Sequence, residues 1–170
     1  MENNMRTHQL LNNVETLQPN VSIREYRAED RNCVFRLLSF LPDLYPRSFD
    51  WLERRLSDVE RKHAHCTIAL VNYRIAGILI DTPKGLRTSK ISTLFVSEKT
   101  SRNGLGSLLF EASARRWYAH GIDGVYVTVA GQKQQRIDAF LRMNGFVESA
   151  NLPDRYGPGR NEFVYSLKLN

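Results

Sequence analysis

The chain has 170 residues, of which 42% are hydrophobic, enough for one folded domain with its own core. The composition excludes a disordered chain, and the apolar runs are too short to span a bilayer, so we expect no membrane partner. The formal net charge of +6 favours anionic partners without choosing among them. Residues 1–20 are polar and lack the pattern of a secretory signal. We expect them to form an N-terminal extension to a single cytoplasmic domain over residues 21–170.

In chain order, the domain is predicted to read strand, two helices, three strands, helix, strand, helix and two strands. Alternation of apolar and polar residues predicts half-buried strands, and apolar residues at helical spacing predict helices. Pro42 is expected to end the first helix, and Ser48 to cap the second. Asn72 and Tyr73 are expected to form a hairpin turn. The predicted strands are residues 21–26, 67–71, 74–80, 91–96, 125–129, 146–149 and 162–169, and the predicted helices begin at residues 28, 48, 105 and 134.

The cysteine and histidine residues do not predict a metal site. Cys33 and Cys66 lie far apart in the sequence and are expected to be buried thiols in a reducing compartment. His63 and His65 could share one face of a strand, but no second cluster of ligands accompanies them. We therefore expect no bound metal.

The most informative segment joins the strand at residues 91–96 to the helix that begins at Leu105. Gly104 and Gly106 lie where this helix starts, and neither carries a Cβ. The first turn of a helix exposes unpaired N–H groups and the positive end of the helix dipole, so it attracts an anion. Leu109 stands where a dinucleotide-binding fold needs a third glycine, and Ser107 stands where a P-loop needs lysine. Neither of these two phosphate loops fits.

The segment from Ser101 to Gly106 resembles the acyl-CoA loop of the GNAT superfamily of N-acyltransferases. That loop has Gln or Arg, two further residues, and then Gly-x-Gly or Gly-x-Ala. Both glycines match, whereas Ser101 replaces the Gln or Arg. The resemblance extends over residues 21–169: Asn144-Gly145-Phe146 ends a helix as the family's Leu-Gly-Phe does, and Gln134 stands in place of the family's Asn.

The resemblance implies an α/β (α+β) fold, with a mixed sheet of about seven strands and about four helices on its two faces. The sheet would splay between its fourth and fifth strands, and acetyl-CoA would lie in the split. The loop amides would hold the pyrophosphate, while the pantetheine arm would pair with the fourth strand. The cofactor-binding residues that it implies are Phe95, Val96, Ser101, Arg102, Asn103, Gly104, Leu105, Gly106, Ser107 and Gln134.

The resemblance does not supply the groups that transfer protons. Ser92 and Thr93 stand where the family often has a carboxylate, and Leu141 stands where it has a tyrosine acid. Tyr156, in the long loop before the last strand, is the candidate acid that would protonate the thiolate, unless it only packs the loop. Ser92 and Thr93 could instead orient a water that carries the proton.

These patterns predict an enzyme, an N-acetyltransferase that moves acetyl from acetyl-CoA to a primary amine of an unidentified acceptor. Two alternatives stay open. The basic charge suits a toxin that acetylates aminoacyl-tRNA, and the missing carboxylate and tyrosine suit an acyl-CoA-binding or partner-binding module without catalysis. Nucleic acid is retained as a partner but is not favoured, because the basic residues are scattered. We expect a monomer or a homodimer.

Overall fold

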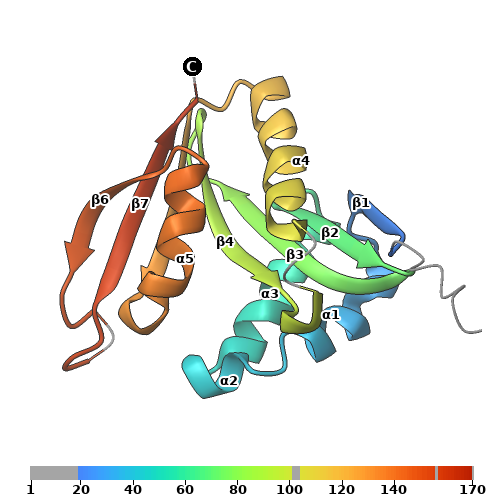
Figure 1. Cartoon of the computed structure of the whole chain (residues 1–170), viewed down its shortest axis with the longest axis horizontal. Coiled ribbons are helices and arrows are strands. Elements are labelled where there is room, and N and C mark those ends of the chain that lie inside the picture. Colours follow the sequence, from blue (N-terminus) through green and yellow to red (C-terminus); the bar gives the residue numbers. More distant parts are fainter. Residues whose placement is uncertain (1–18, 101–103, 156, 170) are drawn as a thin grey trace, which may run out of the picture.

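The computed structural model describes residues 19–100, 104–155 and 157–169, which form one seven-stranded sheet with helices on both faces (Figure 1). The strand order is β1-β2-β3-β4-β5-β7-β6, and neighbours are antiparallel except for the parallel pair β4 and β5. The strands are β1 (Val21–Glu25), β2 (His65–Val71), β3 (Arg74–Pro83), β4 (Thr88–Val96), β5 (Gly124–Ala130), β6 (Val147–Leu152) and β7 (Glu162–Lys168). The helices are η1 (Ala28–Asp30), α1 (Arg31–Leu37), α2 (Leu41–Leu44), α3 (Ser48–Glu60), η2 (Glu98–Thr100), α4 (Leu105–Ala119) and α5 (Gly131–Met143), with η1 and η2 in the 3₁₀ form.

Each face of the sheet buries its own hydrophobic core beneath helices. On the α4–α5 face, the two helices contribute Leu105, Leu109, Trp117 and Leu141. On the opposite face, α1 and α3 contribute Val34, Leu52 and Leu56, and Leu38 follows directly after α1. This face is the α1–α3 face below. None of the described helices is both long and apolar enough to cross a membrane.

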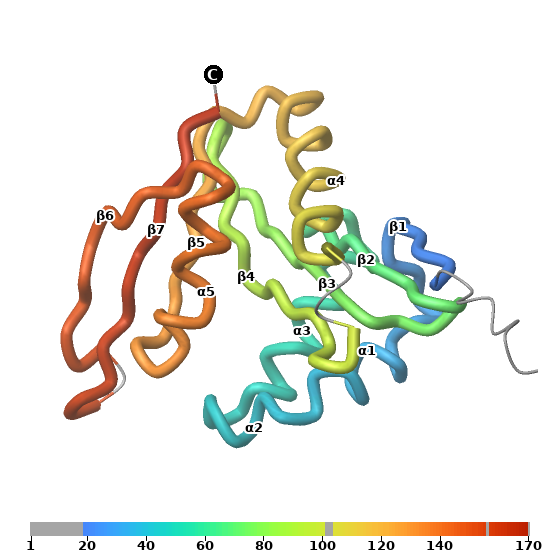
Figure 2. Tube along the Cα trace, in the orientation of Figure 1, coloured from blue at the N-terminus to red at the C-terminus, as the bar shows by residue number. Residues whose placement is uncertain are grey.

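The sheet opens between β4 and β5. Their pairing covers only Thr88–Ile91 of β4 and Gly124–Val127 of β5, so the later parts of both strands diverge. Figure 2 shows the two traces separating below this point, with α5 beside the gap. The register of β3 against β4 shifts at the same level, which leaves Ser92 as a bulge without a counterpart on β3. The segment Ser92–Val96 therefore has an edge towards β5 that no described strand covers.

A buried ion pair ties α4 to the sheet. Asp81 of β3 is 1% exposed, and its carboxylate accepts hydrogen bonds from Arg116 Nη2, from Trp117 Nε1 at 3.0 Å and from Ser89 Oγ at 2.9 Å. Arg116 Nη1 also donates to Thr67 Oγ1 at 3.2 Å. Either charge would be left buried and unpaired without the other, so the pair holds α4 in place over β2 and β3.

The predicted order of elements is confirmed, but two details before β2 were wrong. Pro42 does not end the first helix: α1 ends at Leu37, and Pro42 lies in the first turn of α2, where no intrahelical partner is lost. Ser48 does not cap α3, because Arg47, with a φ of 56°, is the N-cap. The Ser48 hydroxyl is buried and has no hydrogen-bond partner among the described residues.

The hairpin between β2 and β3 is confirmed. Val71 pairs with Arg74 across a two-residue turn of Asn72 and Tyr73. Both turn residues have positive φ, 48° and 65°, as a type I′ turn requires.

Candidate functional site

The turn that leads into α4 has an open backbone. Gly104 is the N-cap of α4 with a φ of +66°, a conformation that favours glycine, and a Cβ there would have no neighbour within 4 Å. Glycine offers no side chain to bond the first N–H groups of α4, which runs for 15 residues. An anion can therefore approach the start of this helix.

The other predicted loop residues differ in how exposed their side chains are and in whether the structure describes them. Leu105 is fully buried, so it could contribute only its backbone, whereas Ser107 is exposed in the first turn. Ser101, Arg102 and Asn103 lie outside the described residues.

Gly106 has a second role that the sequence does not reveal. A Cβ at this position would lie 3.2 Å from Phe140 Cε2 of α5, which is tighter than most Cβ contacts in proteins. Glycine here lets α4 and α5 approach each other beside the split. A substitution of Gly106 therefore changes helix packing as well as any anion site.

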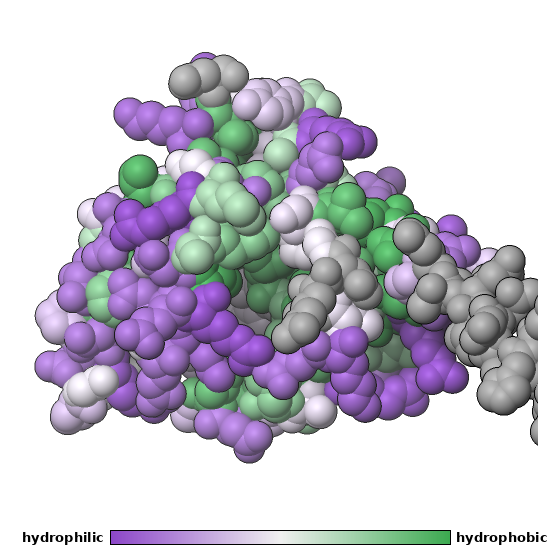
Figure 3. Space-filling view, viewed as in Figure 1, coloured by the Kyte–Doolittle hydropathy of each residue, from purple (hydrophilic) through white to green (hydrophobic). Residues whose placement is uncertain are grey.

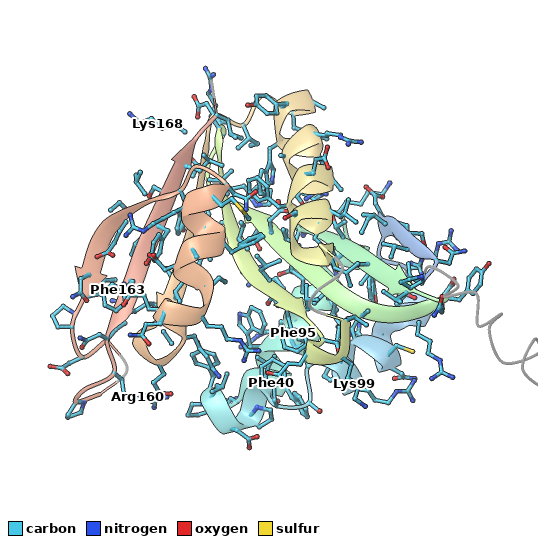
Figure 4. All side chains as sticks on the ribbon, viewed as in Figure 1. Phe40, Phe95, Lys99, Arg160, Phe163 and Lys168 are labelled. Atoms are coloured by element: carbon cyan, nitrogen blue, oxygen red, sulfur yellow. The ribbon has the colours of Figure 1, made fainter. Side chains whose placement is uncertain are left out.

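The uncovered edge of β4 lies next to this turn. Phe95 and Val96, predicted to pair with the pantetheine arm, point to opposite faces of the sheet. Phe95 packs on Phe40 (Figure 4), and the two ring centroids are 4.7 Å apart. Val96 joins the core under α4. Figure 3 shows the surface hollowed between α5 and the lower end of α4, with hydrophobic side chains at its floor. An extended ligand could add to β4 there as an extra strand.

A chain of polar groups lies at the bulge, on the α1–α3 face. Ser92 Oγ lies 3.2 Å from Thr82 Oγ1 of β3, and Arg55 Nη1 of α3 donates to Thr82 Oγ1 at 3.2 Å. Arg55 also pairs with Asp58 at 3.2 Å, and its buried Nε has no hydrogen-bond partner among the described residues. The sequence prediction included Ser92 but missed Thr82 and Arg55, because only the bulge brings the three together.

Gln134 lies in the first turns of α5, and its amide is turned towards β6 and β7. Its Nε2 donates to Tyr165 Oη at 3.2 Å and to Glu148 Oε2 at 3.3 Å. Tyr165 Oη donates to Asp138 Oδ1 at 2.6 Å. Burial and then this bond raise the pKa of Tyr165, while the same bond, followed by one from Arg142, lowers the pKa of Asp138. Contact between Gln134 and a pantetheine arm stays a prediction.

The positions considered for proton transfer are only partly described. Leu141, in the place of the family's tyrosine, is 1% exposed within the α4–α5 core, so no acid acts from there. Tyr156, the predicted acid, lies outside the described residues. Within the described part of the chain, no three His, Cys, Asp or Glu side chains are grouped to hold a metal. His63 precedes β2, so it does not share a strand face with His65.

A pocket of about 310 Å³ opens at the carboxyl end of β5, where the sheet splays. Three segments that are distant in the sequence form its wall: the end of α2, the start of α5, and the connection from β6 to β7. Arg160 Nη2 donates to the Leu44 carbonyl at 2.9 Å and so links this connection to α2. Figure 4 shows Arg160 below the first turn of α5 and Phe163 beside the lower part of this helix. The lining includes Leu44, Tyr45, Lys133, Arg160, Asn161 and Phe163.

The sheet also carries a group of cations around Lys90 of β4. Lys90 is half-buried, and its Nζ lies 5.8 Å from the ring centroid of Tyr126 of β5. Burial lowers the pKa of Lys90, and the carboxylate of Glu162 opposes this effect. The pKa is lowered further by three cations, Lys84, Arg55 and Arg155. Positive charge therefore exceeds negative charge around Lys90.

Residues 24–146 match a family model described as the acetyltransferase (GNAT) family. The chain belongs to the GNAT acetyltransferase family. Among curated proteins, none matches the chain.

Solved GNAT structures share the fold at low sequence identity. A GNAT-family protein from Desulfovibrio desulfuricans has a TM-score of 0.76 and 20% identity, over 88% of this chain and 99% of that one. The ribosomal-protein-S18-alanine N-acetyltransferase from Escherichia coli has a TM-score of 0.74 and 16% identity, over 89% and 95%. A GNAT family acetyltransferase from Elizabethkingia anophelis, solved with acetyl-CoA bound, has a TM-score of 0.71 and 15% identity, over 88% and 99%. These likenesses confirm the predicted fold, and the family match confirms the predicted class of enzyme.

Proposed function

We propose that this GNAT protein transfers acetyl from acetyl-CoA to a primary amine. The observation that carries the proposal is the uncovered edge of β4 after the Ser92 bulge, next to the open first turn of α4. The edge offers backbone groups to a pantetheine arm, and the turn offers N–H groups to a pyrophosphate. Acetyl-CoA, when bound, supplies the acetyl thioester. The residues that would hold acetyl-CoA are Phe95 on β4 and the predicted loop residues, Gly104 among them.

The chain's own residues must then move two protons. The amine has to lose a proton before it attacks, and the departing thiolate has to gain one. Ser92 lies at the bulge on the α1–α3 face, where its hydroxyl is held by Thr82 and, through Thr82, by the Arg55 guanidinium. We assign to Ser92 the orientation of a water that takes the ammonium proton. Tyr156 is proposed as the acid that protonates the thiolate.

Release of free thiol from acetyl-CoA, measured over a panel of primary amines, tests the activity. We expect turnover to rise with pH towards the ionisation of each amine, because no carboxylate stands at the bulge to act as a strong base. A profile with an acidic limb near about pH 6 that is the same for weak and strong amines would show that another base operates. Tyr156→Phe should lower kcat by roughly 10²-fold. A loss under about threefold would mean that Tyr156 only packs the loop and is not the acid.

Ser92→Ala tests the hydroxyl chain. It should lower kcat while the KM for acetyl-CoA is unchanged, because the backbone edge that binds the cofactor is kept. Ser149→Ala, at an exposed position of β6, is the matched control. Equal rates in the two variants would remove Ser92 from the mechanism.

Two other results would change the functional assignment. Binding of acetyl-CoA without thiol release for any amine would indicate an acyl-CoA-binding module. Acetylation of aminoacyl-tRNA, with no reaction of free amines, would indicate the toxin.

A further inference from the structure

Building on this proposed function, we infer that the acceptor is a small primary amine that also carries a carboxylate or phosphate group. The anionic group would bind in the pocket between α2, the start of α5 and the β6–β7 connection. The inference rests on the size of this pocket and on the charges of its lining.

The size of the pocket favours a small acceptor. Its volume of about 310 Å³ is at the lower end of the range of about 300–1,000 Å³ that small-molecule sites occupy. Leu44, Tyr45 and Phe163 give it an apolar wall, and Arg160 and Lys133 bring charge to its rim. Such a site holds a short carbon chain with one strongly polar end.

The charges of the lining favour an anionic end. Two of the lining residues are cations and none is Asp or Glu. Arg160 forms no ion pair among the described residues, and its one described side-chain hydrogen bond, from Nη2 to the Leu44 carbonyl, leaves the other N–H groups of the guanidinium for a ligand. A guanidinium held in this way matches the two oxygens of a carboxylate or phosphate.

Lys133 is the second cation of the lining. It is exposed and forms no ion pair among the described residues. Glu98, whose pKa it helps to lower, is itself paired with Arg136 at 2.6 Å.

Outside the lining, Arg155 lies 4.0 Å from Glu162, which stands between the lining residues Asn161 and Phe163. The two cations of the lining would repel an acceptor with two or more ammonium groups and attract one with an anion.

Three four-carbon amines that differ in one end group test the inference: 4-aminobutyrate, its amide, and 1,4-diaminobutane. We expect kcat/KM to follow that order, with the carboxylate at least about tenfold above the amide, since hydrogen bonds to charged groups are the strong ones. 3-Aminopropyl phosphate separates phosphate from carboxylate as the preferred anion. If the amide or the diamine is acetylated as well as 4-aminobutyrate and the phosphate, the inference is overturned while the proposed activity stands.

Binding without turnover gives the second readout. Saturation-transfer NMR on the protein loaded with coenzyme A should detect 4-aminobutyrate or 3-aminopropyl phosphate but not 1,4-diaminobutane. Preferential binding of the anionic amines supports the inference even if thiol release, and with it the proposed activity, fails. Equal binding of all the amines, or of none, overturns the inference.

Arg160→Gln separates an anion contact from a structural role. We expect the KM for 4-aminobutyrate to rise by about tenfold and the KM for its amide to change by less than about threefold. Arg160→Lys should restore part of the loss, because it keeps the charge. Arg115→Gln, on the exposed side of α4, removes one positive charge elsewhere and is the control. A rise that is equal for 4-aminobutyrate and its amide would mean that Arg160 only holds the loop against Leu44.

Discussion

Gly106→Asp is the most direct test of the anion site at the start of α4. Two unit charges about 8 Å apart repel each other by roughly 2 kcal/mol at an effective dielectric constant of about 20. That energy corresponds to about 30-fold in affinity, and physiological salt reduces it. We therefore expect calorimetry to show acetyl-CoA binding at least about tenfold weaker than in the control variant. The fold should survive, because an acidic residue near a helix N-terminus contributes about 0.3–1 kcal/mol of stability.

The control must be Gly106→Ala, since a Cβ would lie 3.2 Å from Phe140 Cε2. Alanine stabilises a helix by about 1 kcal/mol relative to glycine, and this offsets the cost of moving the Phe140 ring. Its melting temperature should therefore stay close to that of the unmodified protein. Ser107→Asp places a carboxylate on the exposed side of the same turn, away from Phe140, and should also weaken binding. If both Asp variants bind acetyl-CoA within about threefold of their neutral controls Gly106→Ala and Ser107→Asn, the N–H groups of α4 do not hold an anion.

Three further predictions concern α5, the start of β2 and the buried ion pair of Asp81 and Arg116. Gln134→Ala should raise the KM for acetyl-CoA while the thermal midpoint falls only slightly; an unchanged KM would confine Gln134 to its bonds with Tyr165 and Glu148. Burial, followed by Arg116, lowers the pKa of His65 below 6.5, so the folded state binds fewer protons than the unfolded state just below that pH. The free energy of unfolding should therefore fall as pH drops below about 6.5, and His65→Gln should flatten this part of the urea-denaturation profile; an unaltered slope would exclude His65 as its source. Asp81→Asn should cost about 3–5 kcal/mol in urea denaturation, because it leaves Arg116 buried and unpaired, and the double variant with Arg116→Met should recover much of the loss; a cost under about 1 kcal/mol would show that water reaches the pair.

The elements that the sequence predicts well are those specified by neighbouring residues. Asn72 and Tyr73 separate two apolar runs by the length of a hairpin turn, and the structure has that turn. Gly104 precedes an apolar helical pattern, and it is the N-cap of α4, in the left-handed conformation that glycine favours. Pro42 misled the prediction, because proline both ends helices and fits their first turn, and local sequence does not distinguish the two.

The site depends on contacts that no local pattern encodes. Ser92 contacts Thr82, which in turn accepts from Arg55, only because the register of β3 against β4 shifts at the bulge. The pocket at the carboxyl end of β5 joins Leu44, Lys133 and Arg160, which come from three separate parts of the chain. From the sequence, Gly106 is interpreted only as part of an anion site. Its close approach to Phe140 could not be predicted, because it depends on how α5 packs against α4.

The departures of this chain from the family pattern fall on side chains that move protons. Leu141 is buried in the core, and Ser92 and Thr93 stand where a carboxylate is common. The features that would bind acetyl-CoA are mostly backbone features, namely the edge of β4 and the first turn of α4, and these the chain keeps. We therefore expect binding and turnover to be separable here: the proposed lack of a side-chain base would lower the rate without removing the cofactor site. Under the proposed mechanism, turnover depends on the neutral fraction of the acceptor amine. An acceptor held by its anionic end, with its amine in the split, would therefore gain most from positioning.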